Sequence, residues 1–193
     1  VMGDFHGINT LEHQPAKVMA MEGHFESHDE GAPLYLFGLP NMETGTLDHA
    51  VGIPKLGSLI LKHDLNAPLA GLDTIPREDQ PPVAIVFWSF RIMVGLGMLM
   101  ILAGVWSLWL RWRGGLYQSR PFLYFILWMG PSGLLALLAG WFTTEIGRQP
   151  WVVYGLLRTK DAVSAHGDLH MSISLLAFII VYCSVFGVGY SYM

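Results

Sequence analysis

Three long apolar stretches constrain the fold of this chain more than any other feature. Residues 83–111, 121–142 and 169–193 carry very few charged side chains. Each is longer than the about 20 residues that a helix needs to cross a bilayer. With 52% hydrophobic and 13% charged residues, the chain as a whole also has the composition of a membrane protein. The sequence therefore predicts an all-α transmembrane helix bundle in a lipid bilayer, with these three spans as part of a larger bundle.

The segments between the spans are predicted to be a polar region at 1–82, a link at 112–120 and a loop at 143–168. Within the first, Pro15 is expected to open a helix over AKVMAMEGHFE, PLYLF to form a short strand, and residues 55–63 a short helix. The run MGPSG predicts a kink in the second span. The first residues do not resemble a signal peptide, and both ends look cut, so we expect a piece of a longer protein.

Charge and cysteine content exclude several classes of function. The net charge is −4 with a pI near 6.0, which provides no basic surface for nucleic acid. The single cysteine, Cys183, excludes an internal disulfide and a cysteine zinc cluster. The histidines of the polar region are a competing idea for a metal site, which we do not favour: His6, His13, His24, His28 and His49.

The distribution of arginines predicts the orientation of the spans. Arg111, Arg113 and Arg120 lie in or beside the 112–120 link, which holds no acidic residue, so by the positive-inside rule this link is cytoplasmic. Residues 1–82 and 143–168 are then periplasmic, in a multi-pass protein of a bacterial inner membrane.

Charged residues at the end of the second span are candidates for a functional site. Glu145 and Arg148 are three residues apart, so on a helical turn they share a face, and Trp141 precedes them by one turn. Charges at the mouth of an apolar segment are usually functional. A pair that only pins a loop onto the helix end remains an alternative.

Two further pairs of residues are candidates for a functional site: Lys17 with Glu22, and Arg91 with Met93. Lys17 and Glu22 lie five residues apart, about 140° around a helix, so each could reach a different polar group of a ligand, or both could belong to a solvated helix face. An arginine within a span, here Arg91, costs roughly 2.5–3.5 kcal/mol and normally has a partner; it could extend outward to the membrane surface or meet an anion such as a haem propionate. Met93 could be an axial ligand of haem iron, although its spacing alone does not distinguish it from other methionines of the span.

Three motifs in order, QPAKVMAMEGHFE, FRIMVGLG and GRQPW, resemble subunit I of the cytochrome bd-type quinol oxidases. The resemblance covers essentially the whole chain and matches the C-terminal portion of that subunit. The compact 1–82 region is similar to the short quinol-loop branch, which includes the cyanide-insensitive oxidases. The resemblance implies that Lys17 and Glu22 bind and oxidise quinol, with ubiquinol as the substrate, Glu22 accepting a proton and Lys17 holding a ring oxygen.

The same resemblance implies roles at the haems. Met93 is expected to be an axial ligand of a low-spin haem b and Arg91 a neighbour of that haem or of quinol. Glu145 is expected to be a ligand or close neighbour of a high-spin haem b, with Trp141 between haems and Arg148 beside propionates or Glu145. A third haem, of type d or b, would complete the site that reduces oxygen to water, and the remaining ligands would lie outside this chain.

The resemblance implies that the complete enzyme is an oxidase that builds a proton gradient without pumping. Its other parts would be the N-terminal half of subunit I and a subunit II, and the 193-residue fragment alone is expected to be inactive. One alternative is a haem- or quinone-binding membrane anchor without oxygen reduction. Another is a transporter-like bundle, which would show inverted repeats that this sequence lacks.

Overall fold

The computed structural model describes residues 2–162 and 168–192, and the chain divides into two compact units after Thr159. Among the described residues, three helices are long and apolar enough to cross a membrane. They cover Val83–Trp112, Arg120–Ile146 and Leu169–Ser191, with mean hydropathies of 2.1, 1.8 and 2.3. The predicted three-span helical fold is confirmed.

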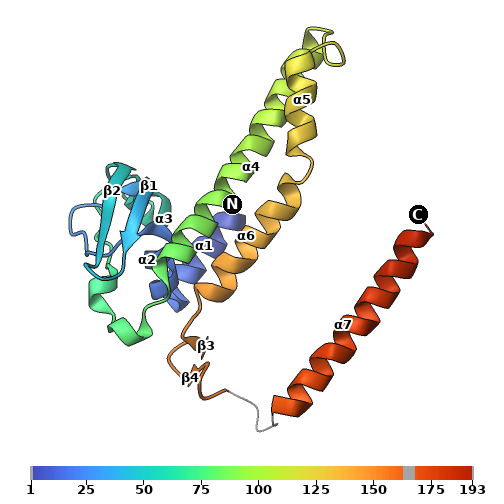
Figure 1. Cartoon of the computed structure of the whole chain (residues 1–193). Helices are drawn as coiled ribbons and strands as arrows, with labels where there is room; N and C mark the ends of the chain where they lie inside the picture. The colour runs from blue at the N-terminus through green and yellow to red at the C-terminus, as the bar shows by residue number, and fades with distance from the viewer. Residues whose placement is uncertain (1, 163–167, 193) are drawn as a thin grey trace. The chain divides into compact units, whose positions relative to one another are not determined.

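The first unit holds most of the secondary structure (Figure 1). Its helices are α1 (Met2–His13), α2 (Pro15–Glu22), α3 (Leu56–Lys62), α4 (Val83–Trp112), α5 (Arg120–Met129) and α6 (Ser132–Ile146). Its strands are β1 (Leu34–Asn41), β2 (Thr46–Ile53), β3 (Trp151–Val153) and β4 (Leu157–Arg158), and two 3₁₀ turns cover Leu72–Thr74 and Arg77–Asp79.

Helix α2 begins at Pro15, as predicted, and ends at Glu22, earlier than the AKVMAMEGHFE pattern suggested. The next residue, Gly23, adopts a left-handed conformation with φ 76°, and its amide donates to the Met19 carbonyl. A Cβ at Gly23 would lie 2.6 Å from the ring of Phe87. Glycine is therefore required here both by the backbone conformation and by the close approach of α4.

The rest of the polar region is a β-hairpin and a short helix. Strands β1 and β2 pair antiparallel, from Leu34 opposite Ile53 to Asn41 opposite Thr46. The predicted strand and the predicted helix, now α3, are both confirmed. The fully buried Ser58 hydroxyl ties α3 to two loops, accepting from the Ala32 amide just before β1 at 2.7 Å and donating to the Ala67 carbonyl at 2.8 Å.

Helices α4 and α6 run side by side along one another (Figure 1). At their contact, the Thr143 hydroxyl donates to the Ser89 hydroxyl at 3.0 Å, and both are buried. Toward the other end of α4, the Trp106 ring contacts the rings of Phe122 and Phe125 of α5.

The second span is divided at residues 130–131, which confirms the predicted kink. Proline has no amide hydrogen to continue the helical ladder, so α5 stops at Met129. The Ser132 hydroxyl donates to the Met129 carbonyl at 2.6 Å and satisfies one of the acceptors that the break leaves open.

A hydrophobic core forms where α2 crosses the start of α4. It contains Met19, Ala20, Phe25, Leu72, Val83, Val86 and Phe87, with Ile146 from the end of α6 packed against it. This core holds the polar region against one end of the two spans.

Helix α6 continues to Ile146, four residues past the predicted end of the span at 142, so Glu145 lies in its last turn. The second unit contains α7 (Asp168–Ser191). Its described side chains are exposed, and Phe178, Tyr182 and Phe186 stack along one face at ring separations of 6.3 and 6.0 Å.

Candidate functional site

A cavity of about 400 Å³ lies where the polar region meets the spans. Elements α1, α2, α3, α4 and α6 all contribute to its walls. Three of the residues predicted from the sequence line it together: Lys17, Glu22 and Met93. The structure thus brings the two charged residues of α2 and the candidate ligand of α4 to one space.

Glu22 is the buried acid of this cavity. Its residue is 7% exposed, and one carboxylate oxygen, Oε2, is buried without a hydrogen-bond partner among the described residues. Burial raises the pKa of the Glu22 carboxyl to about 6, and the Arg91 guanidinium partly opposes this shift. A carboxylate with a pKa near neutrality is suited to exchanging protons with a ligand.

Lys17 approaches the same cavity from the other side of α2. Its aliphatic stem crosses Gly147, where an added Cβ would lie 3.0 Å from the lysine Cγ. Burial lowers the pKa of the Lys17 ammonium, the neighbouring Arg148 lowers it further, and Glu145 raises it. Lys17 and Glu22 form no ion pair in the part of the chain that is described, so both head groups remain available to a ligand.

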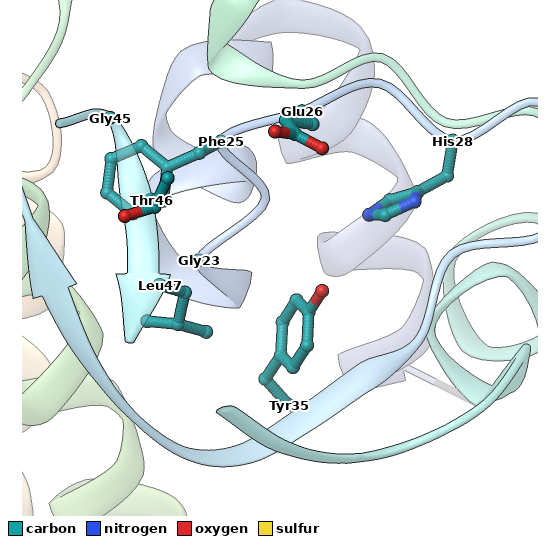
Figure 2. A pocket seen from close by; sticks show the side chains of 8 residues that line it. All are labelled: Gly23, Phe25, Glu26, His28, Tyr35, Gly45, Thr46 and Leu47. Atoms are coloured by element: carbon teal, nitrogen blue, oxygen red, sulfur yellow. The ribbon is translucent and has the colours of Figure 1, made fainter. Parts of the chain in front are cut away.

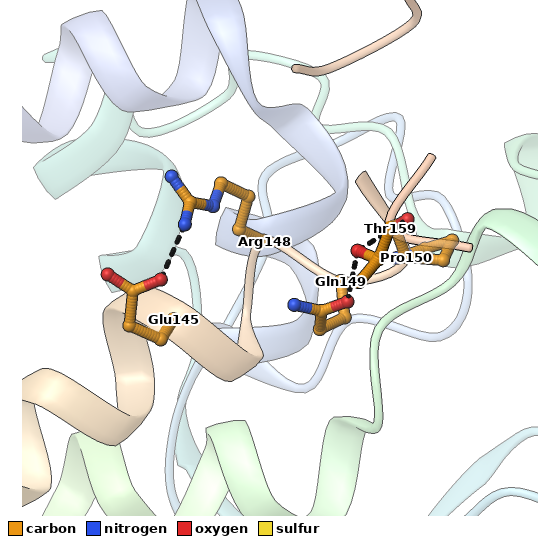
Figure 3. A network of polar contacts seen from close by, with 5 residues as sticks. All are labelled: Glu145, Arg148, Gln149, Pro150 and Thr159. Carbon is orange, nitrogen blue, oxygen red and sulfur yellow. Dashed lines mark hydrogen bonds and ion pairs between the residues drawn. The ribbon is translucent and has the colours of Figure 1, made fainter. Parts of the chain in front are cut away.

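Glu145 and Arg148 form the ion pair that their spacing predicted. The Arg148 Nη2 donates to Glu145 Oε2 at 2.5 Å, with the guanidinium turned back toward the last turn of α6 (Figure 3). Their side chains are 46% and 39% exposed, respectively. Because Arg148 and Glu145 both act on the pKa of Lys17, the two charged pairs lie at the same end of the spans, as expected from the predicted topology.

The residues after Arg148 shape a hairpin rather than line the cavity. The Thr159 hydroxyl donates to Gln149 Oε1 at 2.7 Å, and the Thr159 amide donates to the Pro150 carbonyl at 2.9 Å (Figure 3). Arg158 of β4 donates to Asp79 at 2.7 Å. This pair ties the hairpin to the 3₁₀ turn just before α4.

Arg91 meets carbonyl oxygens instead of an acidic side chain. Its guanidinium donates to the carbonyls of Met21, Glu22, Tyr35 and Phe87. These hydrogen bonds within the described chain therefore offset the free-energy cost of an arginine in an apolar helix. An anion is not needed to explain the presence of Arg91.

Met93 is half-buried, and the structure separates it from the other methionines of α4. An added Cβ at Gly140 of α6 would lie 2.8 Å from the Met93 sulfur, so the thioether occupies the space that the glycine leaves. Met98 and Met100 are 61% and 37% exposed and do not line the cavity. A thioether in a half-buried position is chemically suited to haem iron, so Met93 fits the expected group.

Trp141 is placed away from the cavity. Its side chain is 58% exposed and stacks on Phe142 at a ring separation of 6.0 Å. It is not among the described residues that line the cavity, and its expected position between haems remains a prediction.

Sequence reasoning overlooked a second, smaller pocket of about 180 Å³ on the polar region. Figure 2 shows Glu26, His28 and Tyr35 around it. The ring of His24 contacts those of His28 and Tyr35 edge-on; it is 1% exposed, with Nε2 2.8 Å from the Pro33 carbonyl, and burial lowers its pKa to about 4.

The spacing of His24 and His28, four residues apart, could have drawn attention to this region, because it puts two imidazoles on one face of a helix. Helix α2 has already ended at Glu22, so that spacing has no such effect here. No group of three potential ligands comes together among the residues in 2–162 and 168–192.

The fold and the site define a multi-pass helical membrane protein with a buried acid, a lysine and a thioether around one cavity at the end of its spans. Comparison of the whole sequence gives the family: the chain belongs to the cytochrome bd terminal oxidase subunit I family, whose model matches residues 1–193.

Relatives and a solved structure show the same similarity. The chain is 34% identical over 192 residues to cytochrome bd ubiquinol oxidase subunit 1 of Bacillus subtilis strain 168, covering 93% of this chain and 41% of that protein. It is 28% identical over 246 aligned positions to cytochrome bd-II ubiquinol oxidase subunit 1 of Escherichia coli K12, covering 94% and 48%. The bd oxidase structure from Geobacillus thermodenitrificans matches with a TM-score of 0.70 and 30% identity, over 96% of this chain and 43% of that one.

This chain thus spans less than half the length of each of these relatives. The alignment with the E. coli protein is longer than the 193 residues of this chain, so that relative carries residues that this chain lacks.

Proposed function

We propose that this chain is the C-terminal part of the quinol-oxidising subunit of a cytochrome bd-type oxidase, with ubiquinol as the donor. The observation that carries the proposal is the cavity in which a buried, unpaired Glu22 carboxylate meets Lys17 and Met93. The names of the relatives, which include ubiquinol and menaquinol oxidases, support the same class of substrate.

At this cavity Glu22 accepts a proton from a quinol hydroxyl, because it lines the cavity, its Oε2 has no hydrogen-bond partner among the described residues, and its pKa of about 6 lies close to neutral pH. Lys17 holds a ring oxygen by hydrogen bonding. Its lowered pKa reflects partial burial, which also strengthens a hydrogen bond to the ligand.

Residues of the spans would hold the cofactors. Met93 would be the axial ligand of the low-spin haem b. Glu145, with Arg148 beside it, would contact the high-spin haem b, and Trp141 would lie between the haems. The haems, including one of type d or b, supply the electron relay and the site at which oxygen is reduced to water. Their other ligands belong to the N-terminal half of subunit I.

The site is proposed to face the periplasm of a bacterial inner membrane, with subunit II completing the enzyme. Protons released from quinol on that side, with protons for oxygen reduction taken from the other, build a gradient without a pump. We further propose that this chain belongs to the short-loop branch; the additional residues of the E. coli relative in the alignment support this proposal if they form a longer quinol loop.

The test is a reduced-minus-oxidised visible spectrum of membranes that contain the full-length oxidase, with Met93→Leu and a matched Met98→Leu variant. Met98 is on the same helix but exposed, so its replacement should leave every haem signal unchanged. Met93→Leu should remove or shift the low-spin haem b band and preserve the high-spin signals. A parent without haem would overturn the proposal and point to a membrane anchor without oxygen chemistry.

A further inference from the structure

The guanidinium of Arg91 has used nearly all of its hydrogen-bonding capacity. An arginine has five N–H donors. Nη1 donates to the Met21 carbonyl at 2.7 Å and the Phe87 carbonyl at 3.1 Å, and Nη2 donates to the carbonyls of Tyr35 at 2.5 Å and Glu22 at 3.4 Å. Only Nε–H has no partner in the described chain, and it is buried.

The four acceptors belong to three different segments. The carbonyls of Met21 and Glu22 lie in the last turn of α2, where carbonyls have no partner within the helix and a cation is favourable. The Tyr35 carbonyl belongs to β1, and Phe87 is one turn earlier on α4. The guanidinium carbon also lies 3.3 Å from the centre of the Phe87 ring. A single side chain of α4 thus ties the end of α2 and strand β1 to the span.

Arg91 and Met93 are on the same turn of α4, and both residues therefore move with that helix. Glu22, whose carbonyl Arg91 holds, lines the same cavity as Met93. The distance between the proposed proton acceptor and the proposed haem ligand is consequently set by the bonds of this guanidinium together with the hydrophobic core between α2 and α4.

We propose that Arg91 is a positioning residue, which holds the Glu22 turn of α2 at a set place against the turn of α4 that bears Met93. It acts through the main chain of the polar region, and not as a partner for an acidic group of substrate or cofactor. A bidentate hydrogen bond to a carboxylate needs two N–H groups on one edge of the guanidinium. In Arg91 both η nitrogens already donate to main-chain carbonyls. The inference rests on the proposed function for its kinetic readouts only.

The side chain has a second, electrostatic effect on Glu22. The charged or titratable groups around this carboxylate are Arg91 on α4, Lys17 on α2 and His6 on α1 at the cavity wall; α3 and α6 contribute none to the cavity. Removal of the Arg91 charge should therefore raise the pH at which Glu22 becomes an effective base.

The experiment compares the full-length oxidase with its Arg91→Met and Arg91→Lys variants. Arg113→Met is the matched control, because Arg113 is at the other end of α4, exposed, and stacked on Trp109. Amide hydrogen exchange is measured for the peptide that covers residues 19–36, together with the quinol KM and kcat, the pH profile and the low-spin haem spectrum.

Arg91→Met should speed exchange in this peptide and raise the quinol KM, each at least tenfold, and leave the low-spin haem band in place. The acidic limb of its pH profile should move upward by about 1 pH unit, the lower end of the effect of one nearby charge. Arg91→Lys keeps the charge without the planar fork, so exchange should rise while the acidic limb stays. Arg113→Met should match the parent.

A shift of the low-spin haem band with unchanged exchange would overturn the inference and make Arg91 a direct haem partner. Unchanged exchange and KM in both variants would also overturn it. If Arg91→Met does not assemble, Arg91→Lys decides by the same exchange measurement. If the parent oxidises no quinol, the proposed function fails, but the exchange measurement still tests the positioning role.

Discussion

Replacement of Gly23 with alanine tests how the end of α2 is shaped against the first span. Gly23 has φ 76°, and a Cβ there would lie 2.6 and 2.9 Å from two ring atoms of Phe87. Gly45, in the turn of the β1–β2 hairpin, has a similar φ of 71° but nothing within 4 Å of the added atom. The two substitutions share the backbone cost and differ in the steric contact.

The magnitudes follow from these two terms. A left-handed alanine costs about 1–2 kcal/mol, which Gly45→Ala should show alone. A fully buried Phe87 has no free space to move into, and overpacking a core costs about 1–3 kcal/mol. Gly23→Ala should therefore cost about 2–5 kcal/mol of local stability, and so accelerate exchange of the α2 amides by roughly 30- to 5,000-fold.

The assay is hydrogen exchange of the full-length oxidase, read separately for peptides of α2 and of the β1–β2 hairpin. Gly45→Ala should affect only the hairpin peptide. Because Phe87 also stacks on Arg91, Gly23→Ala should raise the quinol KM as well. Equal effects of the two substitutions on their own peptides would refute the close packing of Phe87 against the end of α2.

Three further predictions concern the charged residues. Folding raises the pKa of the Glu22 carboxyl from 4.5 to about 6, so its stabilising contribution is present below pH 4.5 and lost as pH rises through 6. Glu22→Gln should then unfold at the same temperature as the parent at pH 4, but be more stable by up to about 2 kcal/mol at pH 8; a constant difference between these pH values contradicts this. Lys17→Met keeps the apolar stem and should raise the quinol KM at least tenfold with an unchanged haem spectrum, whereas the exposed Lys62→Met should leave the KM as it was. A double-mutant cycle of Arg158→Met and Asp79→Asn should give a coupling free energy of about 1–2 kcal/mol in thermal unfolding, because the two side chains are only 26% and 21% exposed and bonded at 2.7 Å. Zero coupling would show that this ion pair does not hold the hairpin.

Local chemistry was sufficient to predict the three spans and the start of α2, but not α1, β2 or the β3–β4 hairpin. The absence of charge over three long stretches predicts the spans, because a charge in lipid is expensive and a helix satisfies its own backbone. Pro131 predicted the break of the second span, and Pro15 the start of α2. The Glu145–Arg148 pair followed from their spacing on one helical turn.

The sequence could not predict which of these residues contact one another in the folded chain. The end of α2 depends on the ring of Phe87, which is 64 positions away from Gly23 in sequence. The acceptors of Arg91 are main-chain carbonyls, which carry no sequence signal, so the sequence suggested an outward-reaching side chain or an anion where the structure has the end of α2 and a strand.

Hydrophobicity and the helical period can be read from the sequence, and they were enough for the membrane class, the three spans and the residue types that the site uses. That Lys17, Glu22 and Met93 share one cavity, and that Trp141 stays outside it, became evident from the three-dimensional fold. Burial, and with it the raised pKa of Glu22, arises from the packing of α2 across α4 and α6, and these segments are distant in the chain.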